Sequence, residues 1–224
     1  MSHKILVIAD HHDGQLLDAT GRAVTCAADI GGDIDVLVLA HDGQAIADAA
    51  ATLAGVSGVH LIDNAANEHP MAAVLAPQIV AFADNGGYSH VLGPNTTFGK
   101  DLMPRVAALA DVAMVTDVMA VHGPYEFDRP IYAGNAITTV RAPEAQTLVA
   151  SVRCASYGAA EKTGSASVAA ATVEAELPSH IRFVGLEQAE SDRPDLQTAP
   201  KVISGGRGVG SEENFRIVYD FADK

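Results

Sequence analysis

The chain has 224 residues, of which 48% are hydrophobic and 19% are charged, a composition typical of a folded globular protein rather than a disordered one. Lysines and arginines number 14 against 28 acidic residues, and the resulting net charge of −14 disfavours binding to nucleic acid or to an anionic membrane surface. No apolar run reaches the ~18 residues of a membrane-spanning helix, and the two cysteines, Cys26 and Cys154, cannot by themselves build a disulfide framework or a four-ligand zinc site.

Short runs of valine, isoleucine and leucine alternate with alanine-rich stretches through the first half of the chain. The apolar runs lie at residues 5–8, 36–39, 59–62 and 90–92. Strands that are apolar at consecutive positions are covered on both faces, as in parallel sheets. The intervening stretches predict helices at residues 22–30, 44–54, 71–84 and 99–110. This alternation predicts an α/β fold with right-handed crossovers and a doubly wound, Rossmann-like, mostly parallel sheet.

The N-terminus passes from Met1 into the first apolar run within a few residues, which leaves no room for a signal peptide. We therefore expect a soluble protein of the cytoplasm.

The pattern changes after Asp111, where extended segments follow one another without helices between them. They lie at residues 112–121, 127–132, 136–141 and 147–153. Turn residues separate them, so we predict an antiparallel extension joined to the parallel sheet. The Gly/Ala/Ser-rich residues 155–171 are expected to be a loop. Two further strands, at 170–176 and 181–186, are expected to close a first domain of residues 1–186.

Residues 187–200 are polar and carry Pro194 and Pro200, which is the composition of a linker. The chain then continues with an expected strand at 201–204, a glycine turn and a helical stretch at 212–224. Strand, turn and helix open another α/β domain, but about two dozen residues cannot bury a core of their own. We therefore predict a linker at 187–200 and an incomplete second domain at 201–224.

The glycine turn GGRGVG, residues 205–210, is a candidate anion site. Exposed backbone N–H groups in such a turn bind anions, and Arg207 adds a guanidinium that can grip a phosphate. Its spacing differs from the dinucleotide fingerprint G-x-G-x-x-G. A tight turn that merely needs positive φ is the structural alternative.

Three other groups of residues are weaker candidates. Residues 93–101 imitate a phosphate-binding P-loop, but the glycine spacing is wrong and Asp101 replaces the hydroxyl residue, so we expect only a helix start capped by Thr96 or Thr97. His11, His12 and Asp13 follow the first strand, where a solvated loop is favoured over a metal site. The last group consists of Arg129, Arg141 and Arg153. Pairing with nearby carboxylates explains these arginines better than a basic patch for an acidic partner does.

Nucleophilic catalysis finds little support, because the chain has no G-x-S-x-G elbow and Cys26 lies in a stretch with the composition of a core helix. No catalytic or metal-binding residue is predicted.

Several segments resemble the alpha subunits of electron-transfer flavoproteins. They are GKDLMPRVAAL at 99–109, RPIYAGNA at 129–136, TLVASVR at 147–153, VISGGRG at 202–208, ENF at 213–215 and YDFAD at 219–223. The similarity runs from the first strand to the last residue. It implies an electron carrier rather than an enzyme, one that works in a heterodimer with a beta subunit.

The resemblance further implies that FAD takes electrons from acyl-CoA and related dehydrogenases, as in fatty-acid β-oxidation, and passes them to a membrane quinone reductase. Residues 1–186 would be the base that packs against the beta subunit, and 201–224 would open the FAD domain. A bacterial protein of this family is cytoplasmic and a eukaryotic one lies in the mitochondrial matrix.

Arg207 matches the family's FAD-contacting arginine, and Ser204, Gly205 and Gly206 form its turn. The family's other flavin motifs would lie beyond Lys224, so the resemblance implies a chain truncated within its FAD domain. Two alternatives stay open: a free-standing adenine-nucleotide-binding module, and a structural partner of a beta subunit without redox chemistry of its own.

Overall fold

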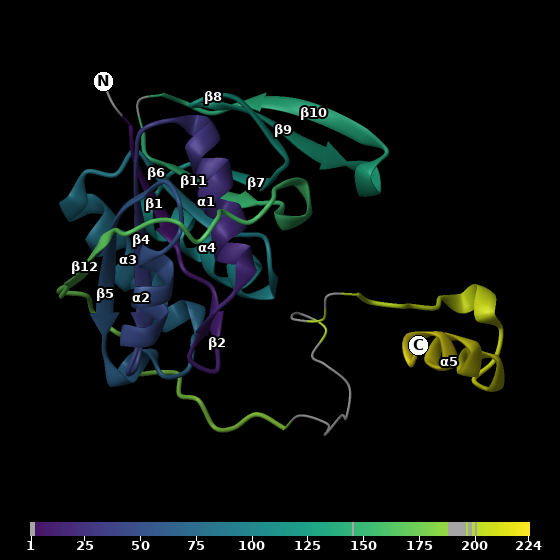
Figure 1. Cartoon of the computed structure of the whole chain (residues 1–224). Coiled ribbons are helices and arrows are strands. Elements are labelled where there is room, and N and C mark those ends of the chain that lie inside the picture. Colours follow the sequence, from purple (N-terminus) through teal and green to yellow (C-terminus); the bar gives the residue numbers. More distant parts are fainter. Residues whose placement is uncertain (1–2, 145, 188–195, 197–198, 200) are drawn as a thin grey trace. The chain divides into compact units, whose positions relative to one another are not determined.

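A computed structural model describes residues 3–144, 146–187, 196, 199 and 201–224 (Figure 1). The chain divides into two compact units, Met1–Phe183 and Val184–Lys224, which are treated separately below. Most of the linker predicted at 187–200 lies outside the described residues.

The first unit is built on a seven-stranded sheet in the order β12-β5-β4-β1-β6-β11-β7. Its strands are β1 (Lys4–Ile8), β4 (Asp33–Ala40), β5 (Val56–Asp63), β6 (His90–Pro94), β7 (Met114–Val118), β11 (Leu148–Val152) and β12 (Ser167–Ala170). All six pairings between neighbouring strands are parallel. The predicted Rossmann-like α/β fold is therefore confirmed.

Four helices cover the two faces of this sheet (Figure 1). They are α1 (Asp18–Ile30), α2 (Gln44–Ala51), α3 (Ala72–Gly86) and α4 (Thr97–Ala110). Successive residues of β1 point to opposite faces, so that Ile5 and Val7 pack in the hydrophobic cluster with α1 and α2, whereas Leu6 and Ile8 pack with α3 and α4. Burial on both faces explains why the strands are apolar at consecutive positions.

A three-stranded antiparallel sheet, here called the arm, contains β8 (Ala120–Gly123), β9 (Glu126–Ile131) and β10 (Ala136–Arg141) (Figure 1). The predicted antiparallel extension is thus present, but one of the segments assigned to it belongs to the parallel sheet. Residues 147–153 form the parallel strand β11 between β6 and β7, and all five residues of β11 are buried. The segment 112–121 also divides at Met119, where the chain leaves β7 and enters β8.

Residues 155–166, expected to be a loop, are held along two helices by backbone hydrogen bonds. Ala160 N donates to Gly21 O at 3.1 Å, and Gly164 N donates to Thr52 O at 2.7 Å. Gly164 passes so close to the carbonyl of Leu53 that a Cβ there would overlap it. The segment then enters β12 on the free edge of β5.

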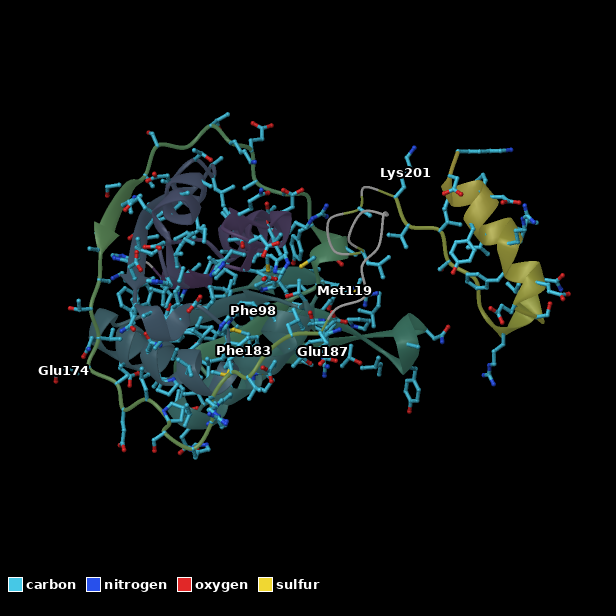
Figure 2. All side chains as sticks on the ribbon, turned by 90° about the horizontal axis from the view of Figure 1, so that it is seen from below. Phe98, Met119, Glu174, Phe183, Glu187 and Lys201 are labelled. Carbon is cyan, nitrogen blue, oxygen red and sulfur yellow. The ribbon has the colours of Figure 1, made fainter. Side chains whose placement is uncertain are left out.

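The strands predicted at 170–176 and 181–186 are wrong, because residues 171–187 contain no strand. Residues 171–177 are instead an extended strap whose alternate side chains are half-buried, which explains the strand-like pattern. Ala171 N donates to Leu61 O at 2.8 Å, and Phe183 stacks on His69 with ring centroids 3.6 Å apart. Figure 2, which views the carboxyl edge of the sheet, shows this segment running from Glu174 to Phe183.

The described residues of the second unit form one short helix, α5 (Arg216–Ala222), preceded by the 3-10 turns η4 (Arg207–Val209) and η5 (Glu213–Phe215). The helical stretch predicted at 212–224 is therefore partly confirmed. The strand predicted at 201–204 is not formed, and the described part of this unit offers no neighbouring strand. None of its described residues is buried. Over the described residues of the whole chain, no helix is long and apolar enough to cross a membrane.

Candidate functional site

An open pocket of about 780 Å³ lies over the glycine turn of the second unit. Its lining includes Gly205, Gly206, Arg207, Gly210, Ser211 and Phe215. Three of the four predicted site residues therefore line one pocket. Ser204, the fourth, immediately precedes them and is exposed.

Backbone hydrogen bonds close the turn tightly. Val209 N donates to Gly206 O at 3.0 Å, and Gly210 N donates to Arg207 O at 3.1 Å. Gly210 has φ +86°, a conformation that favours glycine. A Cβ on Gly205 would lie 2.9 Å from the Phe215 ring and 3.0 Å from side-chain atoms of Val209 and Val218, so glycine is needed for this close packing. Above Gly206 no atom lies within 4 Å of a Cβ position, which leaves its backbone accessible.

Arg207 is exposed, and its guanidinium has no hydrogen-bond or ion-pair partner in the described part of the chain. Arg216, by contrast, pairs with Asp220 at 3.8 Å. A guanidinium without a partner, beside accessible glycine backbone and the Ser211 hydroxyl, is a donor set that suits a phosphate group. The Glu212 carboxylate also lines the pocket and opposes an anion, so the donors that fit a phosphate group are those of Arg207, the glycine backbone and Ser211.

The three arginines of the first unit do not converge on one site. Arg129 donates to the carbonyl and hydroxyl of Thr116. Arg141 pairs with Glu144 at 2.6 Å, as the carboxylate explanation predicted. Arg153 Nη1 lies 3.2 Å from Asp117 Oδ2, in a network that the sequence patterns missed; Asn95 and Ser151 complete it.

His11 and His12 form the two-residue strand β2, which pairs with β3 (Gln15–Leu16) in a hairpin. Their side chains have different partners. His11 Nε2 lies 3.0 Å from Leu39 O, whereas His12 lies 3.5 Å from Asp13 at the exposed turn. The structure does not bring these three residues together as metal ligands. Among the described residues, one group of side chains has the spacing of metal ligands: His41, Asp42 and Asp63, all of them exposed.

The imitation P-loop is a helix start, as predicted. Thr96 Oγ1 accepts from Gly99 N at 3.3 Å and caps α4. Asp101 falls outside the first turn of this helix. The Thr96 hydroxyl also donates to Asp10 Oδ2 at 2.7 Å, so a carboxylate of the chain itself lies beside this helix start. The sequence analysis did not single out Asp10. Its position, a charged residue directly after an apolar strand, could have indicated it.

The thiols are poorly suited to nucleophilic chemistry. Burial raises the pKa of Cys26 to about 12, and it also raises the pKa of Cys154. Because the thiolate is the reactive form, a raised pKa disfavours nucleophilic chemistry at both cysteines. This agrees with the prediction that Cys26 belongs to the core.

Comparison with known proteins gives consistent similarities. A family model described as "Electron transfer flavoprotein domain" matches residues 5–178. The electron transfer flavoprotein subunit alpha of Pseudomonas aeruginosa is 47% identical over 221 residues, which cover 98% of this chain and 70% of that protein. The protein of the same name from Paracoccus denitrificans is 42% identical, with the same coverage. A mitochondrial alpha subunit from Oryza sativa is 38% identical over 98% of this chain and 64% of its own length.

Proposed function

The chain belongs to the alpha-subunit family of electron transfer flavoproteins, which are electron carriers rather than enzymes, and from this premise we propose that it carries electrons on FAD. The donors would be acyl-CoA and related dehydrogenases, as in fatty-acid β-oxidation, and the acceptor a membrane quinone reductase. Residues 1–186 would be the base that packs against a beta subunit, and 201–224 would belong to the FAD domain. We place the protein in the cytoplasm of a bacterium, or in the matrix if it is mitochondrial.

The arrangement around Arg207 is the observation that carries the cofactor proposal. FAD, when bound, supplies the group that takes up and releases electrons. The chain's own part would be to stabilise negative charge on the cofactor: the Arg207 guanidinium would pair with the diphosphate or with negative charge on the flavin. Gly205 and Gly206, after Ser204, would let the backbone approach the cofactor.

The tip of the arm is the surface that we propose for the beta subunit. Tyr132 and Ile137 are 80% and 59% exposed, and β10 has no neighbour on its outer edge among the described strands. Three successive residues, Tyr132, Ala133 and Gly134, have positive φ, and the Asn135 side chain donates to Tyr132 O at 2.8 Å. A strained and hydrogen-bonded turn that presents an aromatic ring to solvent is typical of binding sites.

The alternative of a free-standing nucleotide module is less well supported. It would use the carboxyl edge near His11 and Thr96, but Asp10 places a carboxylate beside the start of α4, where it would repel a phosphate. A purely structural partner of a beta subunit is the remaining alternative, and flavin content distinguishes it from the carrier.

Flavin content is the test. We expect the 224-residue chain alone to show no stoichiometric flavin absorbance, whereas a chain extended to the length of its relatives and co-expressed with a beta subunit binds FAD. In that heterodimer Arg207→Ala should weaken FAD binding by about 10- to 100-fold, the range expected for a hydrogen bond to a charged group. Arg216→Ala, which removes an exposed arginine outside the pocket lining, is the matched control. Unchanged flavin retention in Arg207→Ala would show that the cofactor site has been wrongly placed.

A further inference from the structure

Asn214 ties the glycine turn to the start of α5. Its side-chain Nδ2 donates to Val209 O at 3.1 Å, and its backbone N donates to Ser211 Oγ at 3.2 Å. The first contact joins residues five positions apart across the end of the turn. Asn214 itself does not line the pocket, so it acts on the pocket only through the residues that it holds.

These two contacts hold Val209 and Ser211, at the C-terminal end of the segment that lines the pocket. Val209 precedes Gly210, which has a φ of +86°, and Ser211 lies two residues before η5. Phe215 N donates to the carbonyl of Ser211 at 3.2 Å and to that of Glu212 at 3.0 Å. Gly206, Arg207, Gly210 and Ser211 all line the pocket, so the orientation of this turn sets the direction of its donors.

Hydrophobic packing alone does not hold the turn. Phe215 and Val209 contact the backbone at Gly205, but Phe215 is only half-buried and none of the described residues of the unit is buried. Where no described residue of the unit is buried, a directed hydrogen bond from a side-chain amide is the more specific constraint on loop geometry.

We infer that Asn214 is a positioning residue for phosphate recognition: its amide holds the Val209 carbonyl and thereby fixes the conformation of the turn that carries Arg207. The inference rests on the proposed function, because the ligand is the diphosphate of the cofactor. It adds a residue outside the pocket that determines how well the pocket is formed.

The first experiment uses the 224-residue chain without ligand. Asn214→Asp keeps the size of the side chain but removes the Nδ2–H donor, and Asn214→Ala removes the side chain. Both should move the amide NMR resonances of Gly206, Gly208 and Gly210 and speed the hydrogen exchange of the bonded Val209 and Gly210 amides by about three- to tenfold. Glu213→Gln, an exposed neighbouring substitution, is the control and should leave these resonances in place. Unmoved resonances in both Asn214 variants would overturn the inference.

The second experiment uses the heterodimer of the extended chain and measures the FAD dissociation constant. Asn214→Asp should raise that constant by about three- to tenfold. Because Asn214 acts through the turn that carries Arg207, the double variant Arg207→Ala, Asn214→Asp should bind FAD about as weakly as Arg207→Ala alone. Additive losses would indicate general destabilisation and contradict the positioning role.

The two proposals can fail separately. If Arg207→Ala weakens FAD binding while Asn214→Asp does not, the positioning role is wrong and the cofactor site stands. If Arg207→Ala has no effect, the proposed cofactor site is wrong, and the positioning role toward it falls as well. The NMR result of the unliganded chain then still reports whether Asn214 orders the turn.

Discussion

At the scale of single residues, Asp10 is an ionisable group in an unfavourable place. It is only 4% exposed, and desolvation raises the pKa of its carboxyl, although the Thr96 hydrogen bond and the nearby His11 and His12 partly offset that effect. A raised carboxyl pKa means that ionisation costs more in the folded chain than in the unfolded one. Stability linked to Asp10 is therefore greatest at low pH and falls as pH rises through the raised pKa.

We predict that Asp10→Asn stabilises the chain near neutral pH. The amide oxygen can still accept the Thr96 hydroxyl, while the desolvation cost of the charge disappears. A rise in Tm of a few degrees, roughly the effect of an ordinary single substitution in a chain of this size, is expected from thermal unfolding at pH 7. The gain should shrink as the pH is lowered toward the range where Asp10 is protonated.

Asp101→Asn is the matched control, because it removes the same charge from an exposed position on α4. It should change Tm by less than half of the Asp10→Asn effect. A lower Tm for Asp10→Asn would mean that the charged hydrogen bond to Thr96 outweighs desolvation.

The site residues illustrate what sequence patterns can reach at this scale. Arg207 could be proposed because a local motif carries it and its proposed role needs no distant partner within the chain. Asp10 and Thr96 are 86 positions apart, and Arg153 and Asp117 are 36 apart. Such pairs form only because parallel strands bring their carboxyl ends to one edge, which no local pattern reveals.

At the scale of elements, the arm carries a polar cluster with one residue from each strand. His122 Nε2 of β8 lies 2.9 Å from Asp128 Oδ2 of β9, and Thr139 of β10 donates to Asp128 Oδ1 at 2.6 Å. The bond to Asp128 raises the pKa of His122 above its ordinary 6.5, and the bonds from Thr139 and His122 lower the pKa of Asp128 below 3.8. Glu126 adds to the shift of His122.

We predict that this cluster stabilises the arm within a defined pH window. The His122 contribution is complete below pH 6.5 and is lost as pH rises through the raised pKa; the Asp128 contribution is complete above 3.8 and is lost as pH falls through the lowered pKa. The protection of β8 and β10 amides, expressed as the ratio of intrinsic to observed hydrogen-exchange rate at each pH, should therefore be greatest where His122 is protonated and Asp128 is ionised.

NMR titration of the His122 ring checks the cause. Its midpoint should lie above 6.5 in the wild type and move down in Asp128→Asn. Thr139→Val, which removes only the hydroxyl donor to Asp128, should shift the midpoint of His122 less. A midpoint that does not respond to Asp128→Asn would contradict the pairing.

The type of each element, helix or strand, was predicted more reliably than the strands that lie beside it in a sheet. The strand β10 was predicted with the bounds that the structure has, whereas β11 was predicted as a strand but placed in the wrong sheet. Residues 171–177 show the converse error, because alternate burial against a surface gives the same pattern as a strand. Local periodicity specifies which side chains are covered, but it does not specify which backbone lies alongside.

At the scale of the molecule, the two units differ in how they are held together. The first contains two hydrophobic clusters, one on each face of its sheet, whereas the second has no buried residue among those described. Local opening therefore costs far less free energy in the second unit than in the first.

Limited trypsin digestion should reveal this difference. We expect cleavage after Lys201, Arg207 and Arg216 to be at least about tenfold faster than cleavage after Lys100 or Arg105. Lys100 and Arg105 are exposed but lie on α4, so they control for access to the side chain. Mass spectrometry of the first fragments measures the order, and early cleavage within α4 would contradict the prediction.

The place of β11 in the sheet has a consequence for synthesis on the ribosome. β6 ends at Pro94, but its neighbour β11 begins only at Leu148, after α4, β7 and the whole arm. At ~5–20 residues per second, several seconds pass in which one edge of β6 presents unpaired backbone groups. During that interval the emerging chain can pair with other nascent chains, so a chaperone that shields extended apolar segments should raise the yield of folded protein.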